Sequence, residues 1–231
     1  MKGVNLMRTT DADFGVRAAA VLGEIKSSLD ALPEVALKAL SPERTALVIV
    51  DMVNGFARGG ALYSPRVEAL IPGIAALAEA CGTAGIRSIA FGDAHPADSQ
   101  EFGAYPPHCL ADTEESRLVA ELAAVRGLTL LPKNSTNGYL EPAFQQWLAE
   151  HPALDTFIVV GDCTDICIQQ FSVALKCGFN RVNRPSRVLV PTSLVDTYDY
   201  GLHAGDLMHL MALKMMQDSG VELVRGVTHG H

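Results

Sequence analysis

Residues 158–168, which read IVVGDCTDICI, decide the fold predicted for this chain. The stretch begins with apolar, β-branched residues, which are typical of a buried parallel strand. Gly161 and Asp162 end that run, and apolar residues at helical spacing then continue to Gly178. The stretch therefore predicts a strand, a tight turn and a helix.

A turn of this kind can present a nucleophile, because backbone N–H groups at the start of the helix can hold an oxyanion. We expect Cys167 near the first turn of the helix, where the helix dipole would lower the pKa of the thiol and favour the thiolate. A cysteine behind a strand can equally be a small core residue. The local sequence leaves both interpretations open.

The rest of the chain repeats the alternation of strand and helix. Further apolar strand runs are predicted at residues 45–50, 87–91, 128–131, 187–190 and 221–224, with helical segments between them. This order predicts a three-layer α/β/α domain around a central, mainly parallel six-stranded sheet. Residues 1–44 differ from the rest and predict a helical N-terminal extension that packs on the main domain, residues 45–231, or on a partner subunit.

Composition excludes several classes of function. The chain has 231 residues, of which 48% are hydrophobic, so a large core can form without disulfides or structural metals. The net charge of −8 and the absence of basic runs argue against a nucleic-acid partner. We expect no membrane association, since no apolar run is long enough to span a bilayer and no signal sequence is evident. Five cysteines, an odd number, predict free thiols in the cytoplasm.

Three chemically reactive side chains follow predicted strands. Asp51, Lys133 and Cys167 each come at or beyond the end of an apolar run, and parallel strands end at the same edge of a sheet. A thiol, a carboxylate that takes and returns its proton, and an ammonium form a coherent set for attack on a carbonyl. The alternative interpretation is that Asp51 and Lys133 are ordinary polar residues at strand ends.

A second group of residues suits a metal ion. Asp93, His95, Glu101 and His108 come from one predicted loop, and two imidazoles with carboxylates can bind Zn²⁺, Fe²⁺ or Mn²⁺. The alternative is a polar loop with a His-Pro turn. The other histidines (151, 203, 209, 229 and 231) are expected at surface, helix or tail positions without carboxylate or cysteine neighbours.

Residues 45–225 resemble the isochorismatase-like cysteine hydrolases. Three motifs carry the resemblance in the family's order: LVIVDMVNGF at residues 47–56, LPKNS at residues 131–135 and GDCTDIC at residues 161–167. The resemblance implies that Asp51, Lys133 and Cys167 are catalytic, with Cys167 as the nucleophile. It also implies an oxyanion hole made by the backbone N–H groups of Cys163 and Cys167, with a cis peptide bond before Cys163.

Within this family, the loop at residues 93–109 is similar to the metal motif of the nicotinamidases. That similarity implies hydrolysis of nicotinamide to nicotinate and ammonia through a thioester. It also implies one divalent ion per subunit, foremost Zn²⁺, which binds the pyridine nitrogen through Asp93, His95, Glu101 and His108. Tyr105 stands where many members have a tryptophan, and with Phe56 it is expected to line the ring pocket. The sequence departs from the common nicotinamidase pattern at three positions: Ser99 stands at or near the place of a histidine, Val53 replaces a glutamine, and Gly55 replaces an aspartate near the pocket mouth.

Two other functions remain open from the sequence. The same catalytic residues can act on another small amide, with the loop site weakly occupied or empty. A non-catalytic metal-binding or redox protein on the same scaffold is the second alternative. A sheet with an exposed edge and a separate N-terminal arm favours a homo-oligomer.

Overall fold

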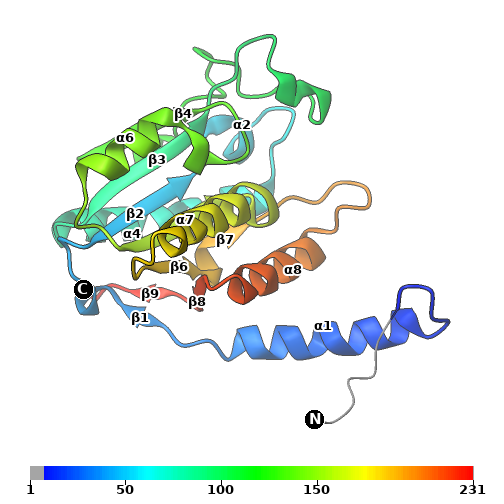
Figure 1. Ribbon diagram of the computed structural model, residues 1–231. Coiled ribbons are helices and arrows are strands. Elements are labelled where there is room, and N and C mark those ends of the chain that lie inside the picture. Colours follow the sequence, from blue (N-terminus) through cyan, green and yellow to red (C-terminus); the bar gives the residue numbers. More distant parts are fainter. Residues whose placement is uncertain (1–7, 231) are drawn as a thin grey trace.

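The computed structural model describes residues 8–230, and its centre is a sheet in which every neighbouring pair of strands is parallel (Figure 1). The strand order is β4-β3-β2-β5-β6-β8, and β7 pairs with β5 beside this path. The bounds are β2 Thr45–Val50, β3 Arg87–Asp93, β4 Leu128–Lys133, β5 Thr156–Asp162, β6 Arg187–Pro191, β7 Val195–Asp196 and β8 Glu222–Val224. The prediction of a mainly parallel α/β sheet is thus confirmed.

The sheet has seven strands where the sequence predicted six. The additional strand is β7, which pairs with Gly161 and Asp162 at the end of β5, beyond the point where β6 has stopped pairing. Two residues carry no periodic pattern, so this strand could not be recognised from the sequence. Its position matters because it brings the following loop beside the turn that carries Cys167.

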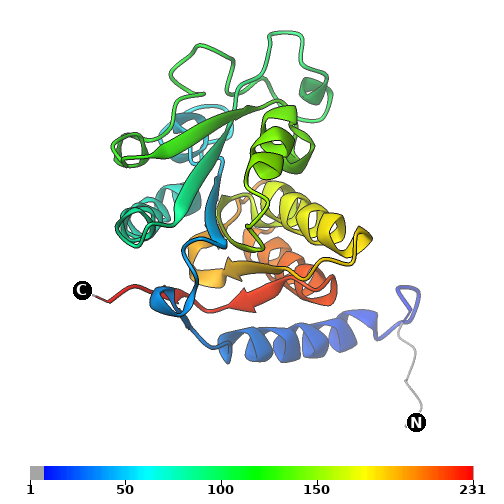
Figure 2. The same ribbon diagram turned by 60° about the vertical axis from the view of Figure 1, so that its left-hand side comes forward.

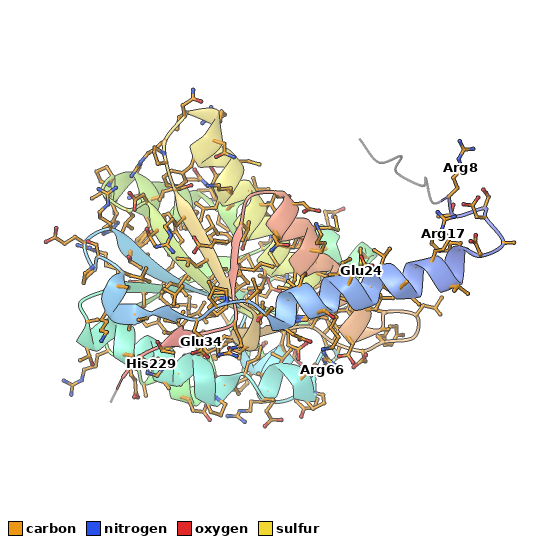
Figure 3. All side chains as sticks on the ribbon, turned by 90° about the horizontal axis from the view of Figure 1, so that it is seen from below. Arg8, Arg17, Glu24, Glu34, Arg66 and His229 are labelled. Atoms are coloured by element: carbon orange, nitrogen blue, oxygen red, sulfur yellow. The ribbon has the colours of Figure 1, made fainter. Side chains whose placement is uncertain are left out.

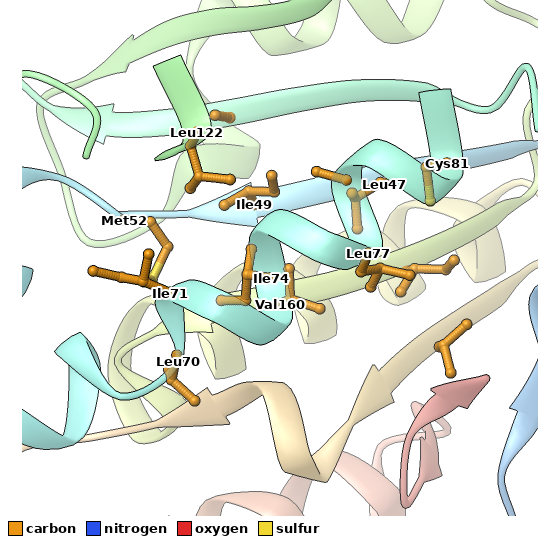
Figure 4. Packing of buried hydrophobic residues seen from close by; sticks show 14 of the residues in the cluster. Leu47, Ile49, Met52, Leu70, Ile71, Ile74, Leu77, Cys81, Leu122 and Val160 are labelled. Atoms are coloured by element: carbon orange, nitrogen blue, oxygen red, sulfur yellow. The ribbon is translucent and has the colours of Figure 1, made fainter. Parts of the chain in front are cut away.

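Helices cover both faces of the sheet, as Figures 1 and 2 show. The helices of the central domain are α2 Asn54–Ala57, α3 Pro65–Glu68, α4 Ile71–Thr83, α5 Ala120–Ala123, α6 Pro142–Glu150, α7 Gln169–Arg181 and α8 Gly205–Asp218. On one face, Ile74 and Leu77 of α4 pack against Leu47 and Ile49 of β2 (Figure 4). On the other face, α6, α7 and α8 contribute a second apolar cluster that includes Phe144, Phe171 and Met216.

Short helical turns complete the chain between the main elements. The 3₁₀ turns are η1 Leu37–Ala39, η2 Gln100–Gly103, η3 Gly138–Leu140 and η5 Thr192–Leu194, and η4 Thr164–Ile168 is a π turn. Cys167 lies in η4, so the nucleophile loop and the helix α7 behind it form one continuous helical segment.

In the segment that leads to β4, only Ala120–Ala123 forms an α-helix, α5. The residues before α5 instead bind the turn after β2: the N–H of Gly55 donates to the carbonyl oxygen of Glu115, and the N–H of Val119 donates to that of Met52. Backbone groups that a helix would pair with one another are here hydrogen-bonded to the turn after β2, so the segment needs no helix to satisfy them.

The segment before the central sheet contains one long helix, which packs on the main domain. The helix α1, Phe14–Asp30, lies against α8, and Leu29 is buried among the side chains of the second cluster. The N-terminal half of α1 projects from the body of the molecule, where Arg17 is labelled in Figure 3 and Val16 is 77% exposed. Beyond α1, strand β1, Val35–Ala36, pairs with β9, Val227–Thr228.

No helix within residues 8–230 is both long enough and apolar enough to cross a lipid bilayer.

Candidate active site

Four neighbouring strands end at one edge of the sheet, and each delivers a reactive side chain there. Asp51 follows β2, Asp93 ends β3, Lys133 ends β4, and Cys167 lies in the turn after β5. The two central strands, β2 and β5, are apolar and buried along their whole length, which fixes their register and so the positions of the residues that follow them. The predicted convergence of Asp51, Lys133 and Cys167 is therefore seen in the structure.

Lys133 lies at the centre of this group. Its Nζ is 3.1 Å from Oδ2 of Asp51 and 4.0 Å from Sγ of Cys167, and it also donates to Oδ1 of Asp93. The carbonyl oxygen of Ser135 accepts a further hydrogen bond from Nζ at 2.8 Å. Burial opposes the charge of Lys133, but Asp51 and Asp93 raise the pKa of the ammonium well above its usual value. Lys133 is therefore a fixed positive charge.

Asp51 is held in an environment suited to proton transfer. Burial and the charge of Asp93 raise the pKa of Asp51 to about 7, although Lys133 lowers it. Among the described residues no well-directed hydrogen bond reaches either carboxylate oxygen, so both can take up a proton. The backbone of Asp51 has a φ of 55°, a strained conformation for a residue other than glycine.

The protonation expected for Cys167 from its position in the sequence was wrong. Burial raises the pKa of the thiol well above its usual value, and Asp51 and Asp93 raise it further, while Lys133 lowers it. The cysteine is 8% exposed, and desolvation disfavours a thiolate more than the helix start favours it. Cys167 is thus a thiol at rest, and it needs a base to become a nucleophile.

The predicted metal ligands form one compact cluster. One ligand atom from each of Asp93, His95, Glu101 and His108 lies within 4.8 Å of the others. Oδ2 of Asp93 is 3.6 Å from Nε2 of both histidines, and Oε1 of Glu101 is 3.9 Å and 4.0 Å from the same two atoms. These four atoms surround a common point, as the ligands of a metal ion do.

The hydrogen bonds of the two imidazoles support metal binding. Nδ1 of His108 is 2.8 Å from the carbonyl oxygen of Pro106, which can only accept, so the proton is on Nδ1. Nδ1 of His95 is 2.9 Å from Oδ1 of Asn134. Both Nε2 lone pairs are then free to bind an ion, and Nε2 of His95 is buried with no hydrogen-bond partner among the described residues. These residues fit a divalent metal.

Asp93 connects the cluster to the other reactive residues, since Oδ1 faces Lys133 and Oδ2 faces the histidines. Burial alone would raise the pKa of Asp93, but the charge of Lys133 and the adjacent imidazoles of His108 and His95 hold it well below its usual value. Asp93 is thus permanently ionised. Its charge in turn raises the pKa of His95 against the effect of burial.

A pocket opens above these groups. Phe56 and Tyr105, the two residues expected beside a substrate ring, both line it, together with Cys163 and Cys167. The sequence did not single out five of the other lining residues, which are Leu62, Thr136, Asp162, Ile166 and Tyr198. Asp162 follows a strand just as Asp51 does, a signal that could have identified it; Tyr198 carries no such signal.

One detail of the nucleophile loop differs from the resemblance. The peptide bond before Cys163 is trans, and residues 8–230 contain no cis peptide bond. The trans form is lower in energy by about 3 kcal/mol for a residue other than proline. Gly161, near the end of β5, has a φ of 120°, which is open to glycine alone. A Cβ there would lie 2.1 Å from the carbonyl oxygen of Val50.

Two other expectations need revision. Gly55 does not border the pocket: it packs against Cys109, whose Sγ lies 2.6 Å from where a Cβ would be. His203 has a carboxylate neighbour after all, because its Nε2 lies 2.8 Å from Oδ2 of Asp165. Ser99, which departs from the family's histidine, lies 3.4 Å from Nδ1 of His95. The histidine at position 231 lies outside the described residues.

Comparisons with known proteins agree with this geometry. Residues 45–225 match the family of the isochorismatase domain. Nicotinamidase 1 of Arabidopsis thaliana is 31% identical over 211 residues, which cover 79% of this chain and 86% of that protein.

Solved structures show the same fold at lower identity. PnC1 of L. infantum in complex with nicotinate has a TM-score of 0.68 and 21% identity, covering 85% of this chain and all of that one (100%). Pyrazinamidase of Pyrococcus horikoshii in complex with zinc has a TM-score of 0.65 and 20% identity, covering 79% and 99% of the two chains. The chain therefore belongs to the isochorismatase family, within its nicotinamidase-like subgroup.

Proposed function

We propose that this amide-hydrolysing enzyme converts nicotinamide to nicotinate and ammonia through a thioester on Cys167. One observation carries the proposal: the pocket is bordered both by Cys167 and by Asp93, Glu101 and His108 of the metal cluster. A nucleophile and a ring-binding ion on the same pocket suit a carboxamide attached to a nitrogen heterocycle. The similarity to a curated nicotinamidase supports the same substrate.

In this proposal Asp51 transfers a proton in each half of the reaction, the first taken from Cys167 and the second returned to it. Asp51 takes the proton from Sγ of Cys167 as the sulfur attacks the carboxamide carbon, and the backbone N–H groups of Cys163 and Cys167 hold the oxyanion. Asp51 then passes the proton to the departing nitrogen, so that the C–N bond breaks and ammonia leaves. A thioester remains on Cys167.

Hydrolysis of the thioester uses the same groups in the reverse direction. Asp51, now ionised, accepts a proton from a water molecule as its oxygen attacks the thioester carbon. The C–S bond breaks, the sulfur recovers the proton from Asp51, and nicotinate leaves. Lys133 stays charged, which keeps Asp51 able to ionise near neutral pH. The pKa of about 7 for Asp51 suits a group that must both accept and donate a proton.

The metal proposal rests on the cluster of Asp93, His95, Glu101 and His108. We propose one divalent ion per subunit, with Zn²⁺ first and Fe²⁺ or Mn²⁺ as alternatives. When bound, the ion would supply a Lewis-acid site for the ring nitrogen, which orients the ring. Phe56 and Tyr105 would then border the ring, and the carboxamide would face Cys167.

Ammonia release from nicotinamide tests the function. The purified protein is stripped with a chelator, assayed, and assayed again after addition of Zn²⁺, Fe²⁺ or Mn²⁺. We expect little turnover without metal and recovery with at least one ion. Turnover that is unchanged by the chelator would contradict the metal proposal. The absence of turnover with every ion would contradict nicotinamide as the substrate and direct the search to other small amides.

We also infer that the enzyme acts as a homo-oligomer in the cytoplasm. All five cysteines are free thiols, which suits a reducing compartment. The projecting half of α1 offers exposed apolar side chains such as Val16 for contact with a second copy. Light scattering on the purified protein would give the mass of a multimer, whereas a monomer mass at micromolar concentration would contradict this inference.

A further inference from the structure

The loop after β7, residues 197–204, is fastened to the nucleophile turn by one carboxylate. Asp165 lies in that turn, two residues before Cys167. Its Oδ1 accepts a hydrogen bond from Oγ1 of Thr197 at 2.6 Å, and its Oδ2 lies 2.8 Å from Nε2 of His203. Thr197 and His203 stand near the two ends of the loop, so Asp165 holds both ends against the turn that carries the nucleophile.

His203 also contacts Tyr198, which lies between the two ends of the loop and lines the pocket. Its Nδ1 is 2.9 Å from the carbonyl oxygen of Tyr198, and because that oxygen can only accept, Nδ1 donates. The imidazole lies flat on the phenol ring of Tyr198, with 4.0 Å between centroids and 5° between planes. One face of the Tyr198 ring is thus covered by His203, which leaves the other face and the edge free for the pocket.

Tyr198 borders the same pocket as Tyr105, Cys163 and Cys167. Burial and the neighbouring acidic groups raise the pKa of its hydroxyl, so the ring stays neutral. The side chains at the tip of the loop are not anchored in the core, since Tyr200 is 81% exposed and Leu202 is 99% exposed. Asp199 fastens the backbone beside Tyr198, because it accepts a hydrogen bond from the N–H of Gly205 at 2.7 Å and lies 3.7 Å from Arg66. The ring of Tyr198 itself is held by the stacked imidazole of His203, which Asp165 in turn fixes.

We propose that Tyr198 is a specificity-determining residue, which presents an aromatic wall to the flat ring of the substrate, and that His203 is the positioning residue that keeps this wall in place. The inference rests on the proposed hydrolysis of an aromatic amide. A preorganised aromatic wall favours a planar heteroaromatic carboxamide over an aliphatic amide, because stacking adds to the affinity of the former only.

Kinetics of two tyrosine variants test the wall. Tyr198→Ala should raise KM for nicotinamide roughly 3- to 10-fold, the range expected for loss of one aromatic contact. kcat should stay within about twofold of the wild-type value, because the lost contact stabilises the bound substrate and the transition state equally. KM for propionamide should not rise. The matched control is Tyr200→Ala, which removes an exposed tyrosine from the same loop and should change neither value. An equal rise in KM for both amides would overturn the proposal.

A double-variant comparison tests the role of His203. His203→Gln should raise KM for nicotinamide in the wild-type background but add nothing in the Tyr198→Ala background, because a positioning residue acts only through the residue it holds. A general structural role predicts that the two effects add. Additive losses would therefore overturn the assignment of His203.

Binding measurements separate this inference from the proposed function. If wild-type enzyme does not release ammonia from nicotinamide, the proposed function fails, and the wall is then tested in zinc-loaded Cys167→Ala protein by calorimetric titration. Nicotinamide should bind more tightly than propionamide, and the further change Tyr198→Ala should remove that preference. Equal binding of the two amides, or no binding of nicotinamide, would overturn the wall.

Discussion

Replacing Lys133 with methionine removes the ammonium that neutralises two buried carboxylates. Nζ lies 3.1 Å from Oδ2 of Asp51 and contacts Oδ1 of Asp93, and all three side chains are at most 3% exposed. Methionine keeps the length and flexibility of the lysine chain, so the change acts mainly on charge. The folded variant must either bury the carboxylates of Asp51 and Asp93 without a counter-charge or bind a proton on one of them.

The expected loss of stability follows from this burial. Removing one partner of a buried ion pair costs about 3–5 kcal/mol. The matched control is Lys214→Met, which removes an exposed pair with Asp218 and should cost less than about 0.5 kcal/mol. Urea denaturation in the presence of a chelator, which prevents an ion from replacing the lost charge, measures both variants.

The loss should also grow with pH. In the wild type the pKa of Asp51 is about 7, and loss of Lys133, which lowers that pKa, moves it higher. Between about pH 7 and pH 8 the folded variant then holds a proton that the unfolded chain has released, so its unfolding free energy falls by about 1.4 kcal/mol per unit. In the wild type the unfolding free energy depends only weakly on pH above pH 7, because Asp51 is by then mostly ionised. A loss no larger than that of Lys214→Met, or one independent of pH, would refute the reasoning.

Three further predictions concern the turn, the pocket and the metal cluster. Gly161→Ala should lower the unfolding free energy by about 3 kcal/mol in urea denaturation, because of its φ and its contact with Val50, whereas Gly127→Ala, in open space, should cost about 1 kcal/mol. Asp162→Asn should flatten the dependence of stability on pH. Burial raises the pKa of Asp162, so wild-type stability falls by about 1.4 kcal/mol per unit as pH rises above the unfolded pKa. Glu101→Gln should weaken Zn²⁺ binding about tenfold or more in competition with a chelator.

Each of these predictions can fail in a definite way. Equal losses for the two glycine variants would show that the close approach at Gly161 is unimportant. An unchanged pH slope in Asp162→Asn would show that the folded protein carries no additional proton there. Unchanged Zn²⁺ affinity in Glu101→Gln would remove Glu101 from the ligand set; the exposed Glu114→Gln is the matched control.

The positions of Asp51, Lys133 and Asp93 could be predicted from the sequence. Each follows or ends a strand that a run of apolar residues identifies, and parallel strands place such residues at one edge. The four-residue metal cluster could be predicted because His95 and His108 belong to one loop with acidic neighbours.

The roles of Tyr198 and His203 could not be predicted in the same way. They lie in an irregular loop whose approach to Asp165 depends on β7, a strand too short to leave a pattern. The pKa of Cys167 was misjudged for a related reason, since it depends on burial by distant segments and on the charges of Asp51 and Asp93. Local sequence contains neither quantity.

Ammonia release from nicotinamide by metal-loaded wild-type, Cys167→Ala and Cys177→Ala proteins tests the central claim most directly. Cys177 is an exposed cysteine on α7, so it controls for loss of a thiol from the same segment of the chain. The account predicts turnover by the wild type and by Cys177→Ala, and none by Cys167→Ala. Turnover by Cys167→Ala, with its fold intact by circular dichroism, would contradict the thioester mechanism.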